Sequence, residues 1–265
     1  MAIPFQKKKS LGQNFLRSNS VVKKIVASAH IEKDEIVLEV GPGKGILTKA
    51  LLEAGAQVIA IEKDHRLIPE LLETFQKEIS EKRFTLIEGD ILELFPGDIP
   101  SITQGNYKVV ANIPYYISGA LLRIFLESVC QPNSMVLMLQ KEVARRIVAR
   151  DGKESILSIS VKAYGVPKYI DTVKKEQFKP IPKVDSAILA VEHISRDFFT
   201  HITQKYFFTV LKTAFGQKRK TIGNTLRKVF AEKTENILTS AGLTKNVRPE
   251  DLTLVDWKRI VSGVQ

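Results

Sequence analysis

The chain is poor in the residues on which small secreted proteins and metal-dependent proteins rely. Its single cysteine, Cys130, excludes an intrachain disulfide, and we expect this thiol in or near the core, beside the apolar helical stretch 120–126. Four scattered histidines show no ligand spacing, so we expect no metal. An apolar run of about 18 residues and a signal-peptide pattern are also missing. These absences favour a cytoplasmic protein without a membrane span.

Positive charge is concentrated at the two ends of the chain. The formal net charge is +11, and residues 1–24 carry six Lys or Arg and no acid. Residues 25–197 carry 22 basic and 24 acidic side chains, whereas residues 198–265 carry 12 and five. Basic ends suit the binding of a polyanion such as RNA, although basic surface can also serve solubility alone. The best candidates for RNA contact are Lys218, Arg219, Lys220, Arg227 and Lys228.

The most informative motif is Asn112-Ile113-Pro114-Tyr115, which follows the apolar run 109–111. The Asn112 side-chain oxygen and a backbone carbonyl of the proline turn can accept both N–H bonds of an exocyclic amine, while Tyr115 stacks on the base. By itself the motif is more often an ordinary strand end with a proline turn. Its functional interpretation therefore depends on what accompanies it.

A glycine-rich turn follows the apolar segment 35–40 and precedes the helical pattern 46–52. Gly41, Gly43 and Gly45 let the backbone approach a ligand, and the helix start offers unpaired N–H groups. Their spacing is G-x-G-x-G, whereas the dinucleotide fingerprint is G-x-G-x-x-G. A diphosphate cofactor is therefore disfavoured.

Acidic residues end the next two predicted strands. Glu62 lies 21 residues after Gly41, where a carboxylate can accept both hydroxyls of a ribose, and Asp90 can accept a hydrogen bond from an adenine amino group. Each acid alone is an ordinary polar strand end. Together with Asn112 at a fourth strand end, they indicate a ligand site, because ligands of open α/β sheets bind at the carboxyl ends of the strands.

These motifs resemble those of the S-adenosylmethionine-dependent methyltransferases and, among them, the ribosomal RNA adenine N6-dimethylases. The resemblance covers nearly the whole chain, and its C-terminal motifs are similar to the bacterial small-subunit branch of that family. The matching segments are 9–16 (KSLGQNFL), 39–43 (EVGPG), 112–115 (NIPY), 178–187 (FKPIPKVDSA), 215–222 (FGQKRKTI) and 248–252 (RPEDL).

The resemblance implies S-adenosylmethionine as cofactor and 16S ribosomal RNA, in the small subunit or its precursor, as partner. It implies dimethylation at N6 of two adjacent adenosines near the 3′ end of that RNA, with a role in subunit biogenesis. The protein is expected to act as a monomer. The implied cofactor contacts are Asn14, Leu16, Gly41, Glu62, Asp90 and Asn112, and the implied catalytic residues are Asn112, Pro114, Tyr115 and Phe178.

Alternating apolar and helical patterns predict an α/β fold, and the resemblance implies a Rossmann-like seven-stranded sheet. We expect strands near 35–40, 57–62, 84–89, 107–113 and 134–140, closed by a hairpin of 168–177 and 184–193. From about residue 198 the pattern is helical. The predicted domains are 1–195, binding S-adenosylmethionine and carrying catalysis, and 196–265, a helical RNA-binding domain.

Other functions stay open on the sequence alone. A nicotinamide-dependent oxidoreductase would share the sheet and Glu62, but it gives no reason for residues 112–115. A ribosome-assembly factor that acts mainly by binding would share the basic tail. Within the methyltransferases, the target can also be DNA, or large-subunit RNA as in the macrolide-resistance enzymes.

Overall fold

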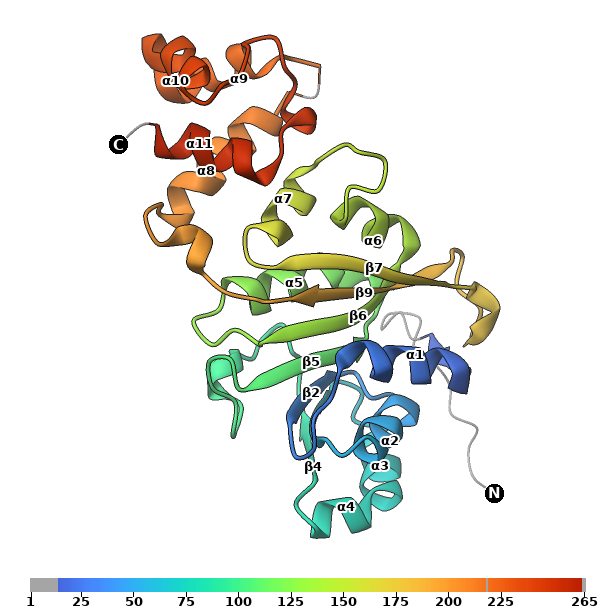
Figure 1. Cartoon of the computed structure of the whole chain (residues 1–265). Coiled ribbons are helices and arrows are strands. Elements are labelled where there is room, and N and C mark those ends of the chain that lie inside the picture. Colours follow the sequence, from blue (N-terminus) through green and yellow to red (C-terminus); the bar gives the residue numbers. More distant parts are fainter. Residues whose placement is uncertain (1–13, 218, 264–265) are drawn as a thin grey trace. The chain divides into compact units, whose positions relative to one another are not determined.

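The computed structural model describes residues 14–217 and 219–263 and contains a seven-stranded sheet (Figure 1). The strands are β2 (Ile36–Val40), β3 (Gln57–Glu62), β4 (Phe84–Glu88), β5 (Tyr107–Asn112), β6 (Ser134–Gln140), β7 (Val166–Val173) and β9 (Ser186–Glu192). Their order across the sheet is β4-β3-β2-β5-β6-β9-β7. The predicted Rossmann-like seven-stranded fold is thereby confirmed. Lys218 and positions 9–13 of the first motif lie outside the described residues.

The central strands pair in parallel and are covered on both faces. β2 pairs with β3 from Ile36 opposite Gln57 to Val40 opposite Ile61, and its other edge pairs with β5. β5 continues in parallel to β6, whereas β6 and β9 are antiparallel. Because both faces are buried, these strands are mostly apolar and do not alternate between apolar and polar residues.

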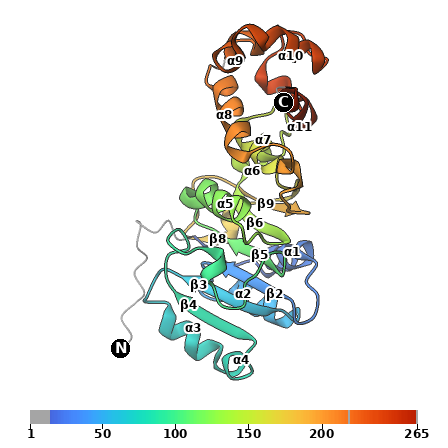
Figure 2. The same cartoon turned by 90° about the vertical axis from the view of Figure 1, so that its left-hand side faces the viewer.

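The chain reverses its direction across the sheet between β2 and β5. The path from β2 through α2 (Ile46–Glu53) to β3 runs towards one edge, and the path from β5 through α5 (Ser118–Glu127) to β6 runs towards the other. Right-handed crossovers then require α2 and α5 to cover opposite faces. α1 (Asn19–Ala29) packs on α2, and Figure 2 shows α1 and α5 on opposite sides of the strands. Reversal points of this kind open a crevice at the carboxyl edge.

The predicted closing hairpin is present, but its first strand is shorter than predicted. β7 ends at Val173, not at residue 177, because the backbone turns into a short 3-10 helix, Lys175–Gln177. Phe178–Lys179 (β8) then pairs with Phe15–Leu16 (β1) in a separate two-stranded sheet. This pairing connects the N-terminal segment to the loop that carries Phe178.

The chain divides into two compact units. The first extends to Ala144 and includes Lys168–Ile194, and the second consists of Arg145–Pro167 and the residues from Ser195 onward. Ser195 coincides with the end of the predicted first domain, whereas the sequence pattern does not predict the grouping of Arg145–Pro167 with the later residues. The remaining helices are α3 (Ile68–Thr74), α4 (Gln76–Ser80), α6 (Lys141–Ile147), α7 (Ile156–Lys162), α8 (Gln204–Phe215), α9 (Ile222–Phe230), α10 (Thr234–Ser240) and α11 (Leu254–Ser262).

Aromatic side chains form much of the core of the second unit. Phe207 is fully buried and meets Phe198 edge to face at a centroid distance of 4.9 Å. Trp257 of α11 is also fully buried and lies 5.8 Å from the ring of Phe215. Edge-to-face pairs add stabilisation beyond the burial of their area.

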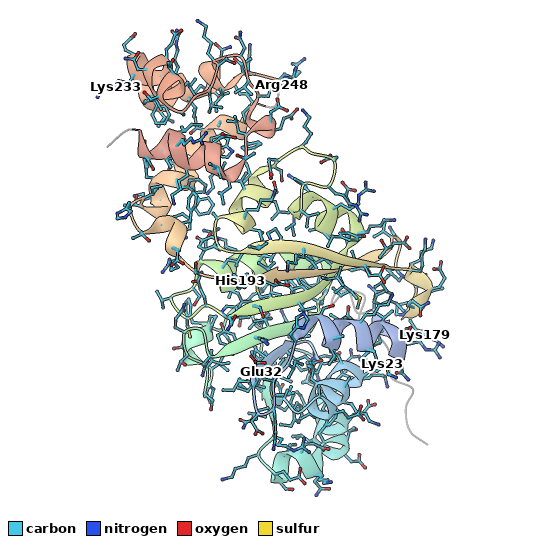
Figure 3. All side chains as sticks on the ribbon, viewed as in Figure 1. Lys23, Glu32, Lys179, His193, Lys233 and Arg248 are labelled. Carbon is cyan, nitrogen blue, oxygen red and sulfur yellow. The ribbon has the colours of Figure 1, made fainter. Side chains whose placement is uncertain are left out.

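Basic side chains lie on the outer side of α9. Arg227 and Lys228 are exposed, while Ile222 and Leu226 of the same helix are buried. Lys220, another candidate for RNA contact, is exposed and precedes the helix. Further exposed cations of this unit include Lys233 and Arg248, which are labelled in Figure 3.

Cys130 is buried as predicted, at 7% exposure. It lies beyond the end of α5 at Glu127, and its burial raises the pKa of the thiol. Cys130 therefore behaves as a small core residue.

Candidate functional site

The turn between β2 and α2 presents backbone to the carboxyl edge of the sheet. Gly41 and Gly43 have positive φ angles of 69° and 61°, which glycine adopts without steric cost. A Cβ on Gly43 would lie 3.1 Å from the Phe15 ring, whereas a Cβ on Gly41 would meet no atom within 4 Å. The room beside Gly41 allows a ligand to approach the backbone closely.

Glu62, the last residue of β3, directs its carboxylate to this turn. Its Oε2 accepts a hydrogen bond from Gly43 N–H at 3.1 Å, and its Oε1 accepts one from Asp64 N–H at 2.8 Å. Burial raises the pKa of Glu62, although these backbone hydrogen bonds oppose the shift. Each carboxylate oxygen has a second lone pair, so Glu62 can accept two more hydrogen bonds from a ligand.

Asp90 follows β4 and is held by Lys63, a residue to which no sequence pattern points. The Asp90 carboxylate forms an ion pair with Lys63 Nζ, and its Oδ1 accepts Leu92 N–H at 3.0 Å. Burial acts to raise the pKa of Asp90, but the hydrogen bonds from Lys63 and Leu92 outweigh it and the pKa is lowered. Asp90 is therefore an ionised acceptor near neutral pH.

Asn112 ends β5 and has a fixed neighbour in the N-terminal segment. Its Nδ2 donates a hydrogen bond to the backbone carbonyl of Asn14 at 3.4 Å. Because the amide nitrogen is engaged there, the side-chain oxygen is the atom available to accept hydrogen bonds from a ligand. Asn14 thus sets which end of the amide is presented.

Two aromatic side chains come to this edge from different elements. Tyr115 begins the 3-10 turn Tyr115–Ile117, and Phe178 lies in β8, where it is 2% exposed and opposite Leu16. Between Asn112 and Tyr115, the Pro114 carbonyl accepts Ile117 N–H at 3.2 Å, which leaves it one lone pair for a ligand.

The structure brings every predicted site residue to one cavity at the reversal point between β2 and β5. The carboxyl ends of four neighbouring strands converge there, which explains why residues far apart in the chain meet. What each residue binds stays a prediction. The predicted residues that line this cavity are Asn14, Leu16, Gly41, Glu62, Asp90, Asn112, Pro114, Tyr115 and Phe178.

Glu39 also lines the cavity, although the sequence motifs predict no role for it. It is 1% exposed, and its Oε2 accepts the Thr48 hydroxyl at 2.6 Å. Burial raises the pKa of Glu39 to about 8, partly offset by the Thr48 hydrogen bond and reinforced by the nearby Glu62. The sequence signal that could have pointed to Glu39 is an acidic residue inside an apolar strand. Burying such a residue costs free energy, so it is retained where it has a role.

The raised pKa of Glu39 predicts a pH effect on stability. Between its ordinary pKa of 4.5 and about 8, the folded protein holds a proton that the unfolded chain has released. Folding stability therefore falls as pH rises through this range, by at most roughly 1.4 kcal/mol per pH unit from this group. Glu39→Gln keeps an acceptor for Thr48 and should make urea-unfolding free energies less dependent on pH between about pH 5 and about pH 8. Parallel pH profiles of variant and wild type would contradict a protonated Glu39.

Two other kinds of site are absent from residues 14–217 and 219–263. These residues contain no group of three or more His, Cys, Asp or Glu placed to hold a metal ion. They also contain no helix with the length and apolar character needed to cross a membrane.

The fold and this cavity define an S-adenosylmethionine-dependent methyltransferase. The glycine turn after β2, the acids that end β3 and follow β4, and Asn112 at the end of β5 surround one crevice of a seven-stranded sheet. More particularly, the family model described as ribosomal RNA adenine dimethylase matches residues 4–265. The chain belongs to this family.

Similar proteins of known name agree with this membership. A ribosomal RNA small subunit methyltransferase A of Dehalococcoides mccartyi is 40% identical over 256 residues, which are 96% of this chain and 87% of the relative. The protein of the same name from Streptococcus gordonii is 39% identical along an alignment of 278 positions, which covers 98% of this chain and 93% of the relative.

Solved structures with the same fold include a 23S rRNA methyltransferase and a dimethyladenosine transferase. The 23S rRNA methyltransferase ErmE has a TM-score of 0.78 at 26% identity, with coverage of 94% of this chain and 99% of that one. A dimethyladenosine transferase from Plasmodium falciparum has a TM-score of 0.76 at 27% identity, with coverage of 92% and 95%.

Proposed function

We propose that this enzyme transfers methyl groups from S-adenosylmethionine to N6 of two adjacent adenosines near the 3′ end of 16S ribosomal RNA, and so contributes to small-subunit biogenesis. The observation that carries the proposal is the position of Asn112, which lines the same cavity as Gly41 and Glu62 and whose amide nitrogen donates to the Asn14 carbonyl. The small-subunit names of relatives that align along almost the whole chain support this choice of RNA.

The residues of the cavity fit the cofactor. Gly41 leaves space for its methionine portion, Glu62 has lone pairs for both ribose hydroxyls, and Asp90 is an ionised acceptor for the adenine amino group. Asn14 and Leu16 close the cavity from the N-terminal segment. When bound, S-adenosylmethionine supplies a methyl group that its sulfonium has already activated as an electrophile.

The residues around Asn112 fit the target base. Adenine N6 is a poor nucleophile because its lone pair is delocalised into the ring. The Asn112 side-chain oxygen and the Pro114 carbonyl accept its two N–H bonds, which favours a pyramidal nitrogen with its lone pair aimed at the methyl group. Tyr115 and Phe178 hold the flipped base between them. The proton leaves to water after transfer, when the product ammonium is strongly acidic.

The direct test is methylation of ribosomal subunits from a strain that lacks this activity. We expect the purified enzyme to label the small subunit and not the large one, with dimethyladenosine at two adjacent positions near the 3′ end of its RNA. Modification of the large subunit would support the alternative of a macrolide-resistance enzyme. Binding without any methyl transfer would support an assembly factor.

We propose further that one chain suffices for activity and that residues 196–265 act as the RNA-binding domain. The exposed Arg227 and Lys228 on α9 provide charge for the phosphate backbone, whose contacts position an RNA but carry little sequence information.

Neutralising these charges should lower the affinity for RNA without affecting cofactor binding. We expect Arg227→Gln/Lys228→Gln to raise the KM for the ribosomal substrate. The log-log salt dependence of RNA affinity should become shallower by roughly 0.7 to 0.9 for each phosphate that the variant no longer neutralises. Substrate titrations at several salt concentrations measure both quantities.

A charge-matched variant in the first unit controls for the loss of net charge. Lys77 and Lys82 are exposed and precede β4, so they lie at the amino edge of the sheet, away from the cavity. Lys77→Gln/Lys82→Gln should keep the wild-type KM and salt slope. If the two double variants behave alike, the basic side of α9 does not contact RNA.

A further inference from the structure

The start of β9 holds a buried hydroxyl against one wall of the cavity. Ser186 is 0% exposed, and its Oγ lies 2.6 Å from the hydroxyl of Tyr115. The position of Ser186 is fixed by β6, because Ser186 pairs with Gln140 in the antiparallel register. A serine in the rigid sheet is therefore hydrogen-bonded to an aromatic residue in a short turn.

This hydrogen bond controls the orientation of the Tyr115 ring. A tyrosine ring held only by packing can swing about its first side-chain torsion, whereas a hydrogen bond at the hydroxyl anchors the far end of the ring and so sets the direction of its long axis. Burial raises the pKa of Tyr115, so the phenol stays protonated and can take part as donor or acceptor. A ring anchored at both ends stays in the position that stacking on a base requires.

Asp185, the residue before Ser186, acts on the other wall of the cavity, which Phe178 forms. Asp185 Oδ1 accepts Lys175 N–H at 3.2 Å, at the start of the 3-10 turn that leads into Phe178. The same carboxylate lies 3.5 Å from Lys174 Nζ and 3.8 Å from Lys141 Nζ. The Lys175 hydrogen bond contributes most to lowering the pKa of Asp185, and the two cationic neighbours lower it further.

We propose that Asp185 and Ser186 are positioning residues that set the two aromatic walls of the slot for the target adenine. Ser186 anchors the hydroxyl end of the Tyr115 ring, and Asp185 fixes the turn that presents Phe178. Two consecutive residues at the start of β9 thus control the distance between the Tyr115 and Phe178 rings and their alignment. This inference rests on the proposed function, since it assumes that the slot receives a base.

A double-mutant cycle on the hydroxyl pair tests the proposal. Ser186→Ala and Tyr115→Phe each remove one partner and keep the ring, so each should lower kcat/KM for ribosomal RNA by about ten-fold. The double variant should lose no more than either single variant, because both remove the same interaction. The affinity for S-adenosylmethionine should stay at the wild-type value in all three.

A second hydroxyl pair in the same unit provides the control. The Tyr169 hydroxyl lies 2.7 Å from Thr172 Oγ1 on β7, and neither residue lines the cavity. Tyr169→Phe should therefore keep the wild-type kcat/KM. For the second wall, Asp185→Ala should lower kcat/KM, and Asp185→Asn, which keeps an acceptor for Lys175 N–H, should recover most of the loss.

The outcomes separate this proposal from the proposed function. A wild-type enzyme that methylates RNA, combined with additive losses in the cycle, would overturn the positioning role alone. The same conclusion would follow if the variants lost only thermal stability and kept full kcat/KM below their unfolding temperature. A wild-type protein that cannot methylate RNA would overturn both.

Discussion

Replacing Asn112 with alanine is expected to lower turnover by roughly 100- to 1,000-fold, the usual effect of removing one hydrogen-bonding group that acts on the reacting atoms. The side-chain oxygen of Asn112 is available at the cavity because its Nδ2 is engaged by the Asn14 carbonyl. Its loss removes an acceptor that orients N6 during transfer, while the other residues proposed to bind cofactor and RNA remain. Single-turnover methylation with saturating ligands measures the effect, and the equilibrium affinity for each ligand should fall much less than the rate.

An asparagine at the opposite end of the same strand provides a matched control. Asn106 precedes β5 and accepts Thr103 N–H at 2.8 Å in an exposed loop. Asn106→Ala should keep the wild-type single-turnover rate.

Tyr115→Ala and Phe178→Ala should reduce activity because they remove base stacking, which is worth roughly 1 to 3 kcal/mol per base. Wild-type turnover by correctly folded Asn112→Ala would refute the catalytic geometry.

The Glu62→Ala variant is expected to bind S-adenosylmethionine far more weakly. Two ribose hydroxyls would lose a charged acceptor, and each such hydrogen bond contributes roughly 1.5 to 3 kcal/mol. The variant also frees Gly43 N–H and Asp64 N–H, which the carboxylate holds in the structure. Isothermal calorimetry with the cofactor gives the change in affinity directly, and RNA affinity should be nearly unchanged.

A glutamine at position 62 separates ribose binding from support of the glycine turn. Glu62→Gln keeps one acceptor oxygen, so we expect an affinity between those of the wild type and the alanine variant. Circular dichroism establishes that each variant is folded before binding is compared. If folded Glu62→Ala binds the cofactor as tightly as the wild type, Glu62 has no part in the cofactor site.

The site residues at the strand ends could be predicted from the sequence, and the reason is geometric. Gly41, Glu62, Asp90 and Asn112 each follow or end an apolar run, and parallel strands bring such positions to one edge of the sheet. The chain order of the strands therefore predicts their proximity, although neighbours in the site are tens of residues apart in the sequence.

The contacts between side chains of different elements could not be predicted from the sequence in this way. The pairing of Phe15–Leu16 with Phe178–Lys179 involves two residues on each side, too few to produce a periodic pattern. The Lys63–Asp90 ion pair and the Ser186–Tyr115 hydrogen bond depend on where side chains point after the sheet has formed. Local propensity contains no information about such contacts.

The interleaving of the two units has a consequence for the order of synthesis. Arg145–Pro167 belongs with the residues from Ser195 onward, yet it is translated before β9, the last strand of the first unit. The contact of α7 with α8 must therefore wait until α8 has left the ribosome. A chain shortened after Ile194 would lack the partner of α7 within the second unit, so an exchange of tails between relatives must transplant both segments.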